Sequence, residues 1–210
     1  MQIHNLIILD ESGSMNSIKK ETISGFNELV QTLKGMKERF PEQEHFISLF
    51  TFNGEGIKPR LYKLPVKGLK EIDGKIYRPH AQTPLFDAIG TSVTKLRDDL
   101  GDLADTNVLV TILTDGRENA SREYTGTQVK RLIDEQKQKG WTFTYIGANH
   151  DVEHVATSIS ITNSITFKAT SEGTAEIFSK ERTSRMEYLR KLNENEDISS
   201  GYYDESDQGQ

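Results

Sequence analysis

The feature that most constrains this chain is its alternation of short apolar runs with stretches of helical periodicity. A strand in a parallel sheet is apolar almost throughout, because helices cover both of its faces. Nearly continuous apolar runs occur in segments 3–9, 108–113, 141–147 and 164–167. Segment 45–52 alternates between apolar and polar residues. The order predicts one α/β domain in which helices cover a central sheet.

Between these runs, apolar residues recur at three- and four-residue steps, which predicts helices over roughly 26–40, 85–100, 129–140 and 171–192. Val152 and Val155 indicate one further short helix. Asn53-Gly54 is a hairpin signal, so 56–64 is expected to pair antiparallel with 45–52. Because Pro59 cannot donate a ladder hydrogen bond, segment 56–64 is placed at the edge of the sheet.

Composition excludes several classes of protein. No run approaches the roughly 18 apolar residues of a membrane span, so no membrane-spanning segment is expected. Residues 1–5 contain no basic region, and the following apolar stretch meets Asp10 too early for a signal peptide. The chain has no cysteine, which excludes disulfides, thiol catalysis and zinc–thiolate sites. Together these features favour a cytoplasmic protein.

The charge is distributed unevenly along the chain. The formal net charge is −6, and segment 193–210 holds six acidic residues and no Lys or Arg. The remaining residues carry 26 acids and 26 bases, so the body is neutral and lacks the basic stripe of a nucleic-acid-binding protein. We therefore expect a folded domain over 1–192 and an acidic, disordered tail over 193–210.

Polar residues follow the predicted strands at the points where ligands bind in open parallel sheets. Asp10-Glu11-Ser12-Gly13-Ser14 follows the first strand, and Thr114-Asp115 follows the strand 108–113. Thr83 lies in the loop before the second long helix. Three hydroxyls and two carboxylates match the oxygen ligands that Mg²⁺ prefers. For Asp10 and Ser12 alone, helix capping is an equally good explanation.

The complete set resembles the von Willebrand factor A family and its metal-ion-dependent adhesion site. The residues that carry the resemblance are Asp10-Glu11-Ser12-Gly13-Ser14-Met15, Thr83-Pro84-Leu85-Phe86-Asp87-Ala88-Ile89 and Leu113-Thr114-Asp115-Gly116. The resemblance implies that Ser12, Ser14 and Thr83 offer hydroxyls to the metal, with Asp10 and Asp115 in support. It also implies a Rossmann-like, doubly wound sheet of about six strands, mostly parallel with one antiparallel edge strand, and helices on both faces.

The physics of such a site indicates protein binding. A cation held largely by neutral hydroxyls keeps most of its positive charge and attracts an external carboxylate as its last ligand. We therefore expect an Asp or Glu side chain of a partner protein to bind there, with Mg²⁺ as the ion and Mn²⁺ or Ca²⁺ as alternatives. The family's stand-alone, intracellular members suggest a chaperone-type ATPase or a stress-response complex as the partner.

Four other residues are candidates for the rim of the partner-binding site: His80, Arg117, Asn149 and Asp151. Asp151 can equally cap the short helix around Val152. Asp87 lies four residues after Thr83 and is expected to hold the loop that contains it. By alternation, Glu11 points away from its neighbours and is not expected to be a ligand.

The alternative is a magnesium-dependent phosphohydrolase with Asp10 as its nucleophile. That chemistry usually needs a second acid two positions later, where this chain has Ser12. Neither a Gly-x-Ser-x-Gly elbow nor a phosphate-binding glycine motif occurs in the sequence. The sequence therefore favours a binding protein over an enzyme.

Overall fold

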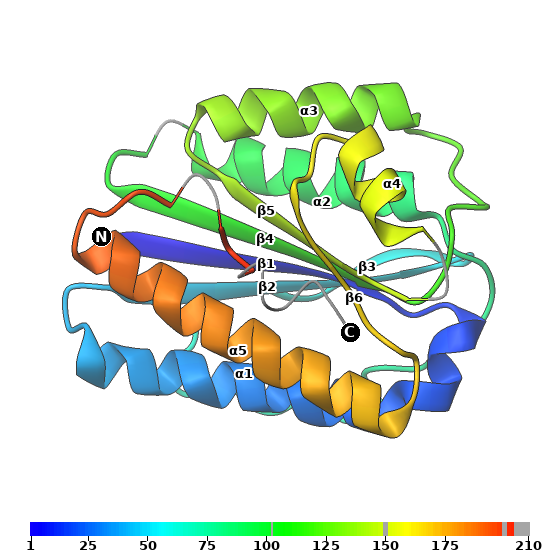
Figure 1. Ribbon diagram of the computed structural model, residues 1–210, viewed down its shortest axis with the longest axis horizontal. Coiled ribbons are helices and arrows are strands. Elements are labelled where there is room, and N and C mark those ends of the chain that lie inside the picture. The colour runs from blue at the N-terminus through cyan, green and yellow to red at the C-terminus, as the bar shows by residue number, and fades with distance from the viewer. Residues whose placement is uncertain (102, 149–150, 199–200, 204–210) are drawn as a thin grey trace.

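A six-stranded sheet forms the centre of the protein, and its strand order is β3-β2-β1-β4-β5-β6 (Figure 1). The computed structural model describes residues 1–101, 103–148, 151–198 and 201–203. The strands are β1 (Gln2–Asp10), β2 (Glu44–Asn53), β3 (Gly56–Pro65), β4 (Thr106–Thr114), β5 (Thr142–Gly147) and β6 (Asn163–Thr166). All neighbouring strands run parallel except β3, which pairs antiparallel with β2 at one edge. The predicted sheet is thereby confirmed.

Helices cover both faces of the sheet, as the sequence predicts (Figure 1). Helices α1 and α5 lie on one face, and α2, α3 and α4 lie on the other. Their bounds are α1 (Lys19–Arg39), α2 (Leu85–Leu100), α3 (Gly126–Gln138), α4 (Val152–Ser158) and α5 (Ser171–Asn193). A short 3₁₀ helix, η1 (Gly13–Ile18), leads from the end of β1 into α1.

The strands supply two apolar cores because successive side chains point to opposite faces. In β1, Ile3, Ile7 and Leu9 pack in the cluster beneath α1 and α5. Leu6 and Ile8 pack in the second cluster, beneath α2 and α3. This two-sided burial explains why β1 is apolar almost throughout, and it confirms the interpretation of 3–9 as a buried strand.

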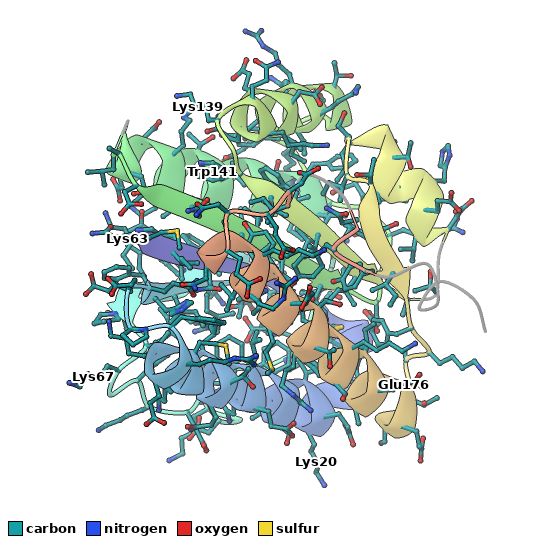
Figure 2. The ribbon with its side chains drawn as sticks, turned by 60° about the vertical axis from the view of Figure 1, so that its left-hand side comes forward. Lys20, Lys63, Lys67, Lys139, Trp141 and Glu176 are labelled. Carbon is teal, nitrogen blue, oxygen red and sulfur yellow. The ribbon has the colours of Figure 1, made fainter. Side chains whose placement is uncertain are left out.

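Charged side chains on the outer faces of the helices extend into solvent. Figure 2 shows Lys20 of α1 and Glu176 of α5 pointing away from the sheet, and both are exposed. Within the part of the chain that the structure describes, no helix is both long enough and apolar enough to cross a lipid bilayer.

Two tyrosines in the segment predicted to be a solvated tail are buried. Tyr202 is 7% exposed and Tyr203 is 3% exposed, and their ring centroids lie 4.9 Å apart. Tyr188 of α5 packs on Tyr202 at 5.8 Å. Aromatic rings bury a large apolar area and their hydroxyls need partners, which Glu181 provides here. At these two residues the chain is therefore packed against the domain. The acidic composition of the segment gives no indication of this packing.

Helices α1 and α5 approach closely at Gly25. A Cβ built on Gly25 would lie 2.2 Å from the ring of Phe178, which is itself buried. We expect Gly25→Ala to lower the free energy of unfolding by about 1–3 kcal/mol, since overpacking outweighs the roughly 1 kcal/mol gained in helix propensity. Urea denaturation measures this change.

Gly35 provides the matched control for Gly25 because it lies in the same helix, and a Cβ built on Gly35 would meet nothing within 4 Å. Gly35→Ala is expected to raise the free energy of unfolding by up to about 1 kcal/mol. A Gly25→Ala protein as stable as Gly35→Ala would show that α1 and α5 do not pack as described.

Candidate metal centre

The polar residues named from the sequence meet at the carboxyl ends of β1 and β4, the two central strands. Asp10 is the last residue of β1, and Asp115 directly follows β4. After β1, the chain adds β2 and β3 on one side of β1, and it then crosses to add β4, β5 and β6 on the other side. The direction in which strands are added therefore reverses between β1 and β4. This is the position at which open α/β sheets place ligands.

Hydrogen bonds connect the residues of this cluster. Ser14 Oγ donates to Asp115 Oδ1 at 2.5 Å, and the hydroxyls of Ser12 and Ser14 are 3.2 Å apart. The backbone N–H of Ser12 donates to Asp10 Oδ1 at 2.7 Å. The two serines therefore bring the β1 loop within direct contact of the residue that follows β4.

Thr83 reaches the same cluster from the loop before α2. A Cβ built on Gly116 would lie 3.1 Å from Thr83 Oγ1 and 3.8 Å from Asp10 Oδ2, so both oxygens flank the glycine. The N–H of Gly13 also donates to the carbonyl of Ala81 at 2.9 Å, which joins the β1 loop to the Thr83 loop. The structure thus brings together the five predicted site residues, Asp10, Ser12, Ser14, Thr83 and Asp115.

The two carboxylates are buried, with exposures of 0% for Asp10 and 2% for Asp115. Burial raises the pKa of Asp10 to about 6; hydrogen bonds from Thr114 and Ser12 act in the opposite direction, and the nearby Asp115 raises the pKa further. Among the described residues, no Lys, Arg or His forms an ion pair with Asp10. A bound cation would stabilise both carboxylates at this position.

The donor set fits a hard cation that accepts hydroxyl ligands. Within the described ranges, no group of three or more His, Asp or Glu side chains is arranged to hold a metal. A metal at this cluster would therefore depend on the hydroxyls of Ser12, Ser14 and Thr83 together with the two aspartates. Mg²⁺ binds such neutral and anionic oxygens, whereas zinc prefers nitrogen and sulfur.

Thr114 and Tyr77, for which the sequence predicts no role, hold Asp10 in place. Thr114 Oγ1 donates to Asp10 Oδ2 at 2.6 Å, and the Tyr77 hydroxyl donates to the main-chain carbonyl of Asp10 at 2.6 Å. The position of Thr114 at the end of a neighbouring strand could have indicated its role. Tyr77 gave no such signal, because it lies in an irregular segment 67 residues away in sequence.

The Thr83 loop is fixed by the segment that follows β4. Asn119 Oδ1 accepts the N–H of Thr83 at 2.9 Å, and the N–H of Asn119 donates to the carbonyl of Thr83 at 3.2 Å. Glu118 accepts the N–H of Phe86 at 2.9 Å. These bonds attach Thr83 and the start of α2 to the loop that begins with Asp115.

Asp87 supports the cluster differently from the sequence-based expectation. Its carboxylate accepts the backbone N–H groups of residues 122, 123 and 124 at 2.7–2.9 Å, so it holds the loop after β4 and not its own loop. Glu11 is buried and turns away from the hydroxyls, and Arg60 of β3 pairs with it at 2.9 Å. Glu11 also accepts the N–H of Arg78 at 2.5 Å, which anchors the start of the Thr83 loop.

The four rim candidates lie in different surroundings. His80 Nε2 lies 3.0 Å from Glu55 Oε2, and its Nδ1 contacts the carbonyl of Arg78 at 2.7 Å. Arg117 is exposed two residues after Asp115. Asp151 is the N-cap of α4, where its side chain accepts the N–H of His154. Asn149 lies outside the described residues.

Comparison with known proteins gives a consistent result for the fold. The sequence model described as von Willebrand factor type A domain matches residues 6–181. No curated protein sequence matches this chain.

Solved structures resemble the chain at low sequence identity. A von Willebrand factor type A protein from Catenulispora acidiphila is 16% identical with a TM-score of 0.55, covering 88% of this chain and 43% of that one. The SpRpn10 VWA domain is 9% identical with a TM-score of 0.53, covering 87% and 94%. The pilus adhesin SpaC from Lactobacillus rhamnosus GG is 10% identical with a TM-score of 0.59, covering 86% and 29%. This chain spans less than half the length of the first and third of these proteins, and the likeness concerns the fold alone.

Proposed function

Since this chain belongs to the von Willebrand factor type A domain family, we propose that it is a protein-binding module whose bound divalent cation captures a carboxylate of a partner protein. Domains of this family commonly mediate protein interaction or adhesion. The observation that carries the proposal is the convergence of Asp10, Ser12, Ser14, Thr83 and Asp115 from three separate segments onto one end of the sheet.

The roles follow from the chemistry of the donors. Ser12, Ser14 and Thr83 would hold the ion with neutral hydroxyls, and Asp10 and Asp115 would balance its charge from the buried side. Gly13 and Ser14 are exposed, so the outer side of the cluster is open to a partner. When bound, Mg²⁺ supplies the positive charge that a partner's Asp or Glu side chain seeks.

The surroundings of Asp10 favour binding over phosphoryl transfer. Its side chain is fully buried, Oδ1 accepts the Ser12 N–H and Oδ2 accepts the Thr114 hydroxyl. A nucleophilic carboxylate needs an oxygen that is free to attack and in contact with substrate. The arrangement suits a carboxylate that supports an ion, and this supports a non-enzymatic role.

The partner is proposed by its chemistry. We propose a protein that presents an accessible Asp or Glu, in a cytoplasmic setting such as a complex with a chaperone-type ATPase or a stress-response assembly. His80, in the Thr83 loop, and Arg117, after β4, would contribute to the rim, and Asn149 and Asp151 are rim candidates beyond β5.

Thermal unfolding with and without millimolar Mg²⁺ tests the metal site. An ion at a hundred times its dissociation constant adds about 2.7 kcal/mol to the free energy of unfolding. For a domain of this size, each kcal/mol raises the unfolding midpoint by roughly 2–4 °C. We expect a rise of several degrees for the wild-type chain and none for Asp10→Ala.

Asp134→Ala is the matched control, because Asp134 lies on α3 and pairs with Lys130 at the surface, away from the cluster. It should keep the full response to Mg²⁺. The proposal is refuted if Mg²⁺, Mn²⁺ and Ca²⁺ all leave the wild-type midpoint unchanged even when acetate is present to supply the last ligand. If Asp10→Ala is unfolded in metal-free buffer, Asp10 has a purely structural role.

A further inference from the structure

A second cluster of buried charge lies against the middle of β1 and β4, away from their carboxyl ends. The Arg185 side chain is 0% exposed and the Glu181 side chain is 1% exposed, and their closest N···O distance is 2.6 Å. Both residues lie on the side of α5 that faces the sheet. Arg185 also donates to Asn5 Oδ1 of β1 and to Thr111 Oγ1 of β4, each at 2.6 Å. The proposed metal-binding function uses none of these groups.

The C-terminal segment covers this charge pair. The Tyr202 hydroxyl donates to Glu181 Oε1 at 3.0 Å, and the Tyr203 hydroxyl donates to Glu181 Oε2 at 2.7 Å. Each carboxylate oxygen therefore accepts one phenol, and Oε1 also accepts two bonds from Arg185. In Figure 1 the red segment that contains these tyrosines crosses the strands next to α5.

Side chains provide most of the contacts that hold this segment in place. Between residues 201–203 and the rest of the described chain, the one backbone hydrogen bond runs from the Tyr202 N–H to Asn163 Oδ1, at a long 3.4 Å. No pairing joins the segment to the neighbouring strand β6, whose described partner is β5. The segment can therefore leave the domain without breaking any ladder of the sheet.

We propose that residues 201–203 form a releasable latch, and that the groove they fill, floored by Glu181 and Arg185, is a binding site for a tyrosine-bearing chain segment. The occupant in the free protein is the chain's own Tyr202-Tyr203 pair. Release leaves Glu181 paired with Arg185, so water meets a compensated ion pair at the floor of the groove. Opening is therefore less costly than exposing an entirely apolar surface of the same size.

The groove is specific for phenols because both oxygens of a fixed carboxylate accept hydroxyl donors. Tyr188 supplies an aromatic wall at 5.8 Å from the Tyr202 ring, and the Tyr203 hydroxyl also interacts with Thr144 of β5. Phenylalanine in place of Tyr203 fits the walls but removes the phenol that donates to Glu181 Oε2, whereas Oε1 keeps its bonds from Arg185. A tyrosine-bearing segment of another protein, or of a second copy, would compete with the latch for the same contacts.

Thiol labelling tests the latch, because the chain has no cysteine of its own. Thr144→Cys places one thiol beneath Tyr203, and Val110→Cys places the control thiol in the core beneath α2 and α3. We expect Cys at position 144 to react with a thiol reagent at least about tenfold faster than Cys at position 110, because only global unfolding exposes the latter. Equal rates at the two positions would overturn the latch.

Tyr203→Phe combined with Thr144→Cys measures the contribution of the phenol. The labelling rate at position 144 should rise by about tenfold, since the lost hydrogen bond is to a charged group. The rate at position 110 and the thermal midpoint serve as readouts of global stability and should change much less. If both positions accelerate together, Tyr203 supports the whole domain and the segment is no separate latch.

A peptide supplied in trans tests the groove as a binding site. In the Tyr202→Ala/Tyr203→Ala chain with Thr144→Cys, the capped peptide Gly-Tyr-Tyr-Asp-Glu-Ser should slow labelling at position 144, and the same peptide with two Phe residues should not. Equal protection by the two peptides, or none by either at millimolar concentration, would refute a phenol-specific site.

Discussion

Replacing Arg185 with methionine should lower the free energy of unfolding by about 3–5 kcal/mol, because it leaves the buried carboxylate of Glu181 without its cation. The substitution also removes the donors to Asn5 and Thr111, two residues of neighbouring central strands. Urea denaturation at pH 7 measures the loss. The thermal midpoint should fall as well, by roughly 2–4 °C for each kcal/mol.

The double variant Arg185→Met/Glu181→Met separates the charge from the packing. Removing both partners of a buried ion pair is often close to neutral, so the double variant should recover most of the stability that the single variant loses. Because Tyr202 and Tyr203 also lose their acceptor, the recovery should be incomplete. A single variant that costs under about 1 kcal/mol, or a double variant as unstable as the single one, would contradict this account.

Acidification should destabilise the domain through His4 and His45. Burial, reinforced by the positive charges of Arg185 and Lys37, lowers the pKa of His45 to about 4, and burial with Lys63 lowers the pKa of His4 to about 4. The unfolded chain binds these protons near pH 6.5, so between about pH 4 and 6.5 it holds more protons than the folded chain. The stabilisation is complete above about pH 6.5 and is lost as the pH falls towards 4.

His45→Met isolates this effect because methionine fills the site without titrating. Both ring nitrogens of His45 lack a hydrogen-bond partner among the described residues, so the substitution leaves no other polar group without its partner. The wild-type chain should lose about 3 kcal/mol more than His45→Met between pH 7 and pH 4. Urea midpoints of both proteins across this range give the difference, and the exposed His154→Gln is the control.

Asp10 acts in the opposite direction within the same window. Because burial raises its pKa to about 6, the folded state gains stability as Asp10 takes up its proton between about pH 6 and pH 4. The comparison of His45→Met with wild type cancels this contribution, which is the same in both proteins. Identical pH profiles for the two proteins would refute the assignment to His45.

Most of the fold could be predicted from the sequence because burial on two faces leaves a clear pattern. Segments 3–9 and 108–113 are apolar because helices cover both faces of the sheet, and both segments are central strands in the structure. Pro59 indicated the edge position of β3, which the structure confirms. The predicted antiparallel pairing through Asn53-Gly54 also agrees with the observed register.

The polar cluster could be assembled from sequence only because its members lie directly after strands or fit a family pattern. Apart from Thr114, the residues that fix the cluster carry no local signal. Asn119 and Tyr77 act through hydrogen bonds to backbone groups 36 and 67 residues away, and such contacts follow from the tertiary fold alone. Asp87 could be expected to support a loop, but which loop depended on how α2 packs.

The latch was hidden for a related reason. Glu181 and Arg185 are four residues apart in a helix, a spacing that usually marks an exposed ion pair on a helix surface. Tyr202 and Tyr203 lie among acidic residues, and this composition is typical of solvated segments. The three-dimensional structure is needed to show that α5 turns Glu181 toward the sheet. There Glu181, Arg185, Tyr202 and Tyr203 form one buried, hydrogen-bonded cluster.

The amino terminus lies at the end of the sheet opposite the candidate metal centre. The Met1 ammonium group pairs with Asp105 at the start of β4, whereas Asp10 and Asp115 lie at the strands' far ends (Figure 1). A biotin or a tag attached at Met1 would therefore orient every molecule on a sensor chip in the same way, with the candidate metal centre facing the flowing solution. This polarity suits the protein to surface-plasmon measurements that test whether acidic peptides bind at the candidate metal centre.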